Sequence, residues 1–89
     1  MTFAEVAKLV ADDFRETMEI HNFETFEEMK QCYWWTSADI KEEVSAILNA
    51  ISKENGIEVY IDELDGSDVM MNGDSISYRA FAKMFRKAI

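Results

Sequence analysis

The sequence contains no proline, only three glycines and a single cysteine among its 89 residues. Without proline, no stretch of the chain resembles a stiff proline-rich linker. The three glycines all lie between Gly56 and Gly73, so we expect the tight turns in that stretch. The lone Cys32 cannot form an internal disulfide, which is typical of a reducing compartment, and we expect it to be an inert, half-buried thiol.

Long apolar runs are also missing. No stretch reaches the ~20 residues of a membrane-spanning helix, and the sequence does not begin with a positive segment followed by an apolar block. We therefore expect a cytoplasmic protein that does not bind membranes. With 48% hydrophobic and 12% aromatic residues, the chain is too apolar for intrinsic disorder, and residues 1–89 are expected to form a single domain.

Motifs for catalysis or metal binding are equally scarce. The one histidine, His21, falls at the end of a predicted helix, where a surface position is expected. The segment DELDGSDVMMNGD lacks the ligand spacing of a calcium loop and is interpreted as turn sequence. No glycine-rich phosphate loop, CxxC or HExxH occurs. We therefore predict a protein that is not an enzyme and that has no metal or other cofactor.

Negative charge dominates what the sequence does contain. Eighteen Asp and Glu residues against nine Lys and Arg residues give a net charge of −9. Residues 1–75 carry all 18 acids and five bases, whereas residues 76–89 carry four bases and no acid. An acidic body repels nucleic-acid phosphates and anionic membranes and is attracted to basic surfaces. Solubility alone also explains such acidity, so both explanations stay open.

Apolar residues recurring every three or four positions predict four helices. The expected ranges are about Thr2 to Ile20, a short helix from about Phe26, about Ser37 to Lys53, and about Tyr78 to Ala88. Thr25 with Glu28 forms a capping box, and Thr36 and Ser77 are expected N-caps. Gly56 is expected to end the third helix in a left-handed conformation.

Alternating apolar and polar residues after Gly56 predict strands. Asp65-Gly66 and Asn72-Gly73 are dipeptides of two-residue hairpin turns, so we expect a small antiparallel meander of two to three strands. The predicted fold is α+β with the order ααα-βββ-α, in which the helices pack on one face of the meander.

The strand register follows from the position of the first turn. A two-residue loop at Asp65-Gly66 places Ile61 opposite Met70 and Tyr60 opposite Met71. Met70 then shares a face with Ile61, and Met71 shares the other face with Tyr60. A slip of one residue would exchange the two faces of the second strand.

Two adjacent tryptophans mark the join between the second and third helices. Trp35 lies just before the third helix, where it can pack on Ile40 as a hydrophobic staple, so we expect it to point inward. Trp34 is four residues after Lys30 and seven after Glu27, so in a continuous helix it shares their polar face. We therefore expect Trp34 to be exposed and available to a partner.

The leading functional hypothesis is a small interaction protein that occupies a basic surface of a nucleic-acid-binding effector. Carboxylates would stand in for phosphates, and exposed aromatics would supply anchoring contacts. Small phage-encoded inhibitors of host defence, of the anti-CRISPR and anti-restriction type, share this profile of size and charge. The expected partner-binding residues are Glu5, Asp12, Glu16, Glu19, Glu27, Trp34, Glu58, Tyr60 and Asp62.

Two alternatives use other surfaces. A nucleic-acid-binding or regulatory module would use the basic last helix, with Arg79, Lys83, Arg86 and Lys87. Four bases against an acidic remainder would bind nucleic acid weakly and with strong salt dependence, and the same bases can pair with acids of their own fold. The other alternative is an adaptor or homodimer whose acidity serves solubility and whose contact is the sheet face with Tyr60 and Met71.

Overall fold

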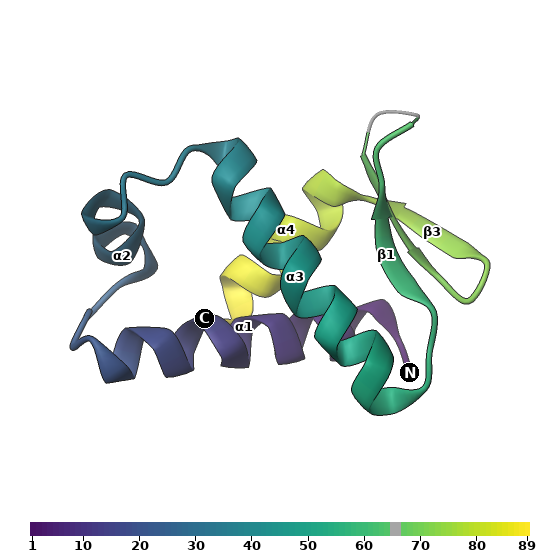
Figure 1. Cartoon of the computed structure of the whole chain (residues 1–89), viewed down its shortest axis with the longest axis horizontal. Helices are drawn as coiled ribbons and strands as arrows, with labels where there is room; N and C mark the ends of the chain where they lie inside the picture. The colour runs from purple at the N-terminus through teal and green to yellow at the C-terminus, as the bar shows by residue number, and fades with distance from the viewer. Residues whose placement is uncertain (65–66) are drawn as a thin grey trace.

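We describe the computed structural model of the chain for residues 1–64 and 67–89 (Figure 1). The fold is α+β, with four helices and a three-stranded antiparallel sheet in the predicted order. The elements are α1 (Phe3–Ile20), α2 (Phe26–Cys32), α3 (Ser37–Asn55), β1 (Val59–Asp62), β2 (Asp68–Met71), β3 (Asp74–Ser77) and α4 (Tyr78–Ala88).

Every helix begins after a polar N-cap residue, because the first backbone N–H groups of a helix have no carbonyl partner within the helix. The predicted caps Thr25, Thr36 and Ser77 each accept a hydrogen bond from the backbone N–H three residues later. The capping box predicted at Thr25 is only half formed, because the Glu28 carboxylate accepts from the backbone N–H of Glu24 instead of that of Thr25. α1 also begins with a capping box, formed by Thr2 and Glu5, which the sequence interpretation did not include. This box holds the pKa of the Glu5 carboxyl below its usual range, because the backbone N–H of Thr2 donates to it.

The first three helices end in the same way. One residue adopts a left-handed conformation, and the next residue's N–H bonds to a carbonyl five positions back. The three bonds, from Phe23 to Met18, from Trp35 to Lys30 and from Ile57 to Ser52, have N···O distances of 2.8, 3.0 and 3.3 Å. The left-handed residues are Asn22, Trp34 and Gly56, with φ of 59°, 58° and 63°.

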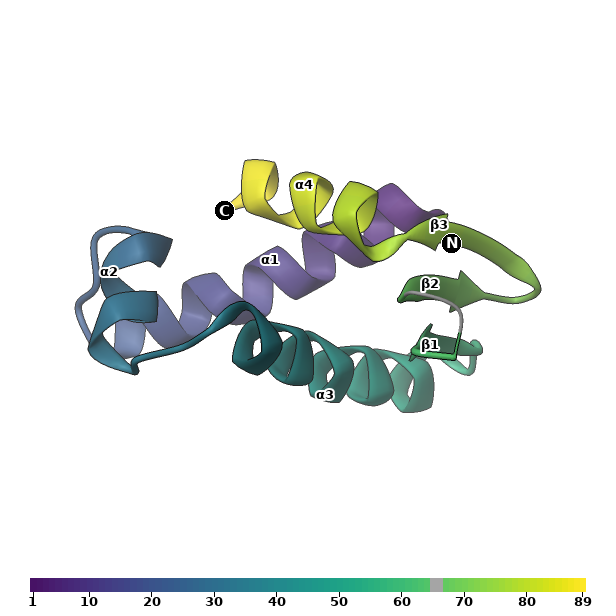
Figure 2. The ribbon, with the colours of Figure 1, turned by 90° about the horizontal axis from the view of Figure 1, so that it is seen from above.

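α1 is the central element of the fold. α4 packs along one side of α1 and α3 crosses it on another, while α2 and the sheet lie at opposite ends of the helical body (Figure 2). β1 lies beside α3, and β3 leads directly into α4. The buried side chains form one hydrophobic cluster, to which all four helices, β1 and β2 contribute. In the part of the chain described, we find no helix with the length and apolar character needed to span a membrane.

The register of the sheet differs by one residue from the predicted one. Tyr60 lies opposite Met70 and Ile61 opposite Val69, and the β1–β2 ladder closes at the Asp62–Asp68 pair. Five residues therefore separate β1 from β2 instead of two. The predicted turn at Asp65-Gly66 lies outside the described residues.

The second hairpin agrees with the sequence. Met71 pairs with Asp74, which leaves Asn72 and Gly73 as a two-residue loop. Both loop residues have positive φ, 49° and 90°, as a type I′ turn requires. Asn72 also binds Glu58 twice, through its backbone N–H at 2.9 Å and its side-chain oxygen at 3.1 Å, which extends the β1–β2 ladder.

The corrected register decides which face of the sheet meets the helices. Val69 and Met71 are buried, and Met71 is only 4% exposed. They share the inner face with Val59, because paired residues lie on the same side of a sheet. Met70 is partly buried and shares the outer face with exposed Tyr60. The proposed homodimer contact through Tyr60 and Met71 is therefore wrong, since these residues lie on opposite faces.

Candidate functional site

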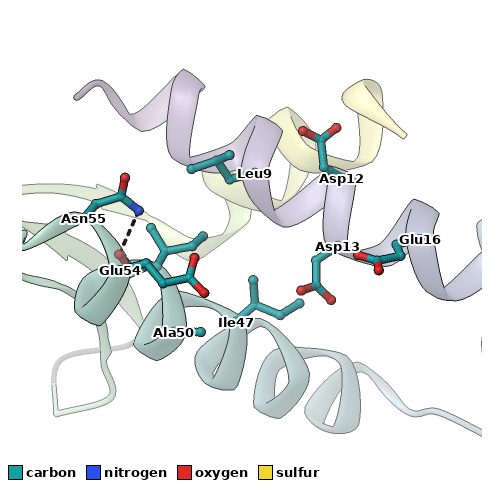
Figure 3. A pocket seen from close by; sticks show the side chains of 9 residues that line it. Leu9, Asp12, Asp13, Glu16, Ile47, Ala50, Glu54 and Asn55 are labelled. Atoms are coloured by element: carbon teal, nitrogen blue, oxygen red, sulfur yellow. Dashed lines mark hydrogen bonds between the residues drawn. The ribbon is translucent and has the colours of Figure 1, made fainter.

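An acidic groove runs between α1 and α3. It has a volume of about 340 Å3, and buried Ile47 and Ile51 of α3 contribute to its apolar floor. Figure 3 shows that Asp13 of α1 points across the groove toward Ile47, while Asp12 points away from α3. The full lining consists of Leu9, Asp12, Asp13 and Glu16 of α1 and Ile47, Ala50, Ile51, Glu54 and Asn55 of α3.

Three of the four carboxylates that line the groove, those of Asp13, Glu16 and Glu54, have no ion-pair partner among the described residues. Asp13 is an exposed residue, but partial desolvation at the groove edge raises the pKa of its carboxyl above its usual range, and the negative charges of Glu16 and Glu54 raise it further. The ion pairs between described residues are Arg15–Asp12, Lys30–Glu27 and Arg86–Glu27, and none of them includes Asp13, Glu16 or Glu54. A cation arriving from outside would therefore relieve a repulsion that the fold itself leaves in place.

The sequence predicted only some of the acidic residues that line this groove. Asp12 and Glu16 were expected partner-binding residues and do line it, whereas Asp13 and Glu54 were not on that list. The spacing of apolar residues could have identified Asp13 and Glu54. Asp13 and Glu16 continue the helical spacing that begins at Leu9, and Glu54 continues the spacing of Ile47 and Ile51. An acid that continues an apolar stripe marks the edge of a helix–helix contact.

The other expected acids of α1 lie outside the groove. Glu5 belongs to the α1 capping box, and Glu19 is exposed near the end of the helix. Arg15 pairs with Asp12 three residues earlier. The long acidic stripe from Glu5 to Glu19 is therefore interrupted by a cap at one end and an ion pair in the middle.

Glu27 is an internal partner of the basic α4 helix. Its carboxylate bonds to Arg86, 59 residues away in the chain, and lies 4.0 Å from Lys30. The Arg86 guanidinium also stacks over the Phe26 ring, with 4.3 Å between the guanidinium carbon and the ring centroid. Arg86 thus fastens α4 to α2, as the sequence interpretation had allowed for.

The remaining basic residues of α4, Arg79, Lys83 and Lys87, are exposed. With Arg86 already engaged by Glu27 and Phe26, the predicted row of four bases offers three of its charges to solvent. The electrostatic basis for nucleic-acid binding through α4 is therefore weaker than the sequence suggested.

The acids and tyrosine of the β1 region form a separate surface. Tyr60 lines a hollow of about 420 Å3 together with Val59 and residues of the exposed face of α3. Glu58 is held by its two bonds to Asn72, and Asp62 accepts the backbone N–H of Leu64 at 3.0 Å. These residues are not part of the α1–α3 groove lining.

The two tryptophans divide as expected, although one does so for a different reason. Trp35 is partly buried and packs edge-on against Phe14 of α1, with ring centroids 6.1 Å apart. Trp34 is 88% exposed. It does not continue the Glu27/Lys30 face of α2, because the helix ends at Cys32 and Trp34 occupies the left-handed position beyond it. Cys32 itself is exposed, so the expected half-buried thiol is wrong.

Comparisons with protein-family models, curated proteins and solved structures gave no match to this chain. Within residues 1–64 and 67–89, no group of three or more His, Cys, Asp or Glu side chains has the geometry to hold a metal ion. The groove carboxylates thus line a surface without converging on one point.

Proposed function

We propose that the protein is a non-enzymatic interaction protein that binds a basic protein surface through the α1–α3 groove. The observation that carries this proposal is the set of three carboxylates, those of Asp13, Glu16 and Glu54, that lie beside an apolar floor without an ion-pair partner among the described residues; partial desolvation and their mutual repulsion raise the pKa of Asp13. Lysine or arginine side chains of a partner would neutralise these charges while their methylene stems cover the floor.

The net charge of the chain indicates the type of partner. A surface that binds phosphates is rich in Lys and Arg, so a body of net charge −9 competes for it by charge complementarity. We therefore place the protein among inhibitors of nucleic-acid-handling proteins, of the phage-encoded anti-CRISPR or anti-restriction type. The support for this assignment is size and charge, together with the groove.

Affinity capture from a bacterial lysate, followed by mass spectrometry, tests the proposal. The decisive variant reverses three groove charges (Asp13→Lys, Glu16→Lys and Glu54→Lys), and its control reverses three exposed acids elsewhere (Glu43→Lys, Glu63→Lys and Asp74→Lys). Both variants carry a net charge of −3 instead of −9. We expect the wild type and the control to enrich a nucleic-acid-handling protein, and the groove variant to lose about tenfold or more of it.

Equal losses for the two variants would mean that only net charge matters and that the groove is not the contact. A matching titration with labelled duplex DNA and single-stranded RNA at low salt tests the alternative function. Tight binding that weakens on replacing Arg79, Lys83 and Lys87 with Gln would assign the protein to the nucleic-acid-binding class and overturn the proposal.

A further inference from the structure

Trp34 occupies a backbone position that suits few residues. It is the left-handed residue after α2, with φ of 58°. The equivalent positions after α1 and α3 hold Asn22 and Gly56, which are the residue types that adopt this conformation at least cost. A bulky aromatic side chain there places Cβ close to the backbone, so the turn would form more easily with Gly or Asn.

The fold gains little from the Trp34 side chain in return. The side chain is 88% exposed, whereas the neighbouring Trp35 packs against Phe14 and Tyr33. The turn itself is made by backbone bonds, from Trp34 N–H to Gln31 and from Trp35 N–H to Lys30. Any residue that tolerates a left-handed conformation can make these bonds. A strained conformation that the fold does not require points to a role outside the fold.

The surroundings of Trp34 indicate the chemistry of its partner. Residues 24–43 contain six acids and two bases, and Arg86 of α4 adds one base beside Glu27, so the α2–α3 end of the molecule is negative. Anionic membranes and a second copy of the chain would both be repelled by this charge. A basic protein surface would be attracted, and a Trp ring is the aromatic side chain best suited to contact Arg or Lys at the rim of an apolar pocket.

We propose that Trp34 is a binding anchor, held in a strained left-handed position so that its indole projects into an apolar pocket of a protein partner, with Lys or Arg at the pocket rim. This inference rests on the proposed function, because it takes the basic partner from it. It adds a second contact, which is apolar and therefore less sensitive to salt than the groove.

A single substitution of Trp34 should raise the stability of the fold and lower the affinity for the partner. Trp34→Gly relieves the backbone strain, so we expect the thermal unfolding temperature of the purified protein to rise by about 4 °C or more. Asn22→Gly is the matched control at the end of α1, where Asn is already tolerated, and we expect a rise of less than about 2 °C. A fall in unfolding temperature for Trp34→Gly would show that the indole supports the fold and would overturn the inference.

The effect on binding is measured by using the same two variants as bait in the lysate, at about 0.5 M NaCl, where exposed charges are strongly screened. A partner retained by wild type and Asn22→Gly but reduced at least about tenfold for Trp34→Gly supports the anchor, provided that titration of the purified partner gives the same order. Equal retention by all three baits contradicts it. If Trp34→Gly binds normally while the groove variant does not, the anchor fails and the proposed function stands.

Two further measurements test other occupants. Wild type and Trp34→Gly are mixed with vesicles of zwitterionic phosphatidylcholine, and their masses in solution are measured by sedimentation. We expect no vesicle binding, because one exposed indole buries too little apolar surface to hold the protein on a neutral bilayer. We also expect no Trp34-dependent dimer, because self-association would bring like charges together. Vesicle binding or dimerisation that disappears in Trp34→Gly would overturn the proposed protein pocket.

Discussion

Neighbouring residues of this chain can have opposite roles, and the tryptophan pair is the clearest case. The sequence predicted that Trp35 points inward and Trp34 outward, and both orientations are confirmed. The reason given for Trp34 was wrong, since it assumed that α2 continues beyond Cys32. Helix ends depend on a single backbone conformation, and a Trp in a left-handed position is not expected from residue preferences.

Trp35→Ala should destabilise the protein by about 2 kcal/mol, which is below the usual cost of a fully buried Trp because the side chain is only partly buried. Its lost contacts include the Phe14 and Tyr33 rings. Urea unfolding followed by circular dichroism measures this loss. Trp34→Ala is the control and should change the free energy of unfolding by less than about 0.5 kcal/mol. Similar losses in the two variants would show that both side chains support the core.

The Asp13 carboxyl should make the stability of the folded protein depend on pH. Its pKa is raised in the folded chain, chiefly by partial desolvation and then by Glu16 and Glu54, so its charge costs more when folded than when unfolded. This penalty is complete at neutral pH and is relieved as the pH falls through the folded pKa and then the unfolded one. Asp13→Asn should therefore stabilise the protein at neutral pH, by no more than about 1 kcal/mol because solvent screens the groove, and should have no effect in strong acid.

Asp12→Asn is the adjacent control for Asp13→Asn. Asp12 pairs with Arg15 and points away from α3, so its neutralisation should give no gain at neutral pH. Chemical denaturation at several pH values distinguishes the two substitutions. A neutral or destabilising effect of Asp13→Asn at neutral pH and low salt would contradict the electrostatic description of the groove.

Local sequence patterns predict where the strands lie but do not always predict how the strands pair. Alternation located β1, β2 and β3, and the Asn72-Gly73 turn fixed the register of the second hairpin. The predicted register of the first hairpin was wrong by one residue, because it followed from an assumed two-residue loop. The observed register lets Val69 and Met71 share the inner face with Val59, whereas the predicted one placed Met70 there.

Alanine substitutions at the two methionines test this register. Met71→Ala removes a side chain that is 4% exposed and should lower the free energy of unfolding by about 2–4 kcal/mol. Met70→Ala removes a partly buried side chain of the outer face and should cost less than about 1 kcal/mol. Thermal and urea unfolding of both variants give the comparison, and the reverse order of costs would favour the register predicted from the sequence.

At the scale of the whole molecule, excess negative charge is the main electrostatic feature. The chain has 18 acids and nine bases, and Arg86 is partly neutralised by Glu27 across 59 residues of sequence. Self-repulsion of this kind destabilises a compact state and is reduced by dissolved ions. The groove between α1 and α3 concentrates part of the excess on one surface.

Raising NaCl from about 20 mM to about 500 mM should therefore stabilise the protein, with about 4 °C in unfolding temperature for each 1 kcal/mol of repulsion removed. Differential scanning calorimetry measures the shift. The groove triple-Lys variant has a net charge of −3 and should gain less from salt than the wild type. An unfolding temperature that falls with added NaCl would mean that favourable ion pairs outweigh the repulsion.

Features that depend on residues within a few positions of one another were predictable from the amino-acid sequence. Helical and alternating spacing gave the order of elements, and side-chain caps such as Thr36 and Ser77 gave the helix starts. The register of β1 on β2, the electrostatic influence of Glu54 on Asp13 and the ion pair between Arg86 and Glu27 became visible only in the folded chain. These depend on how distant segments pack, because burial selects among arrangements that local hydrogen bonding permits equally well.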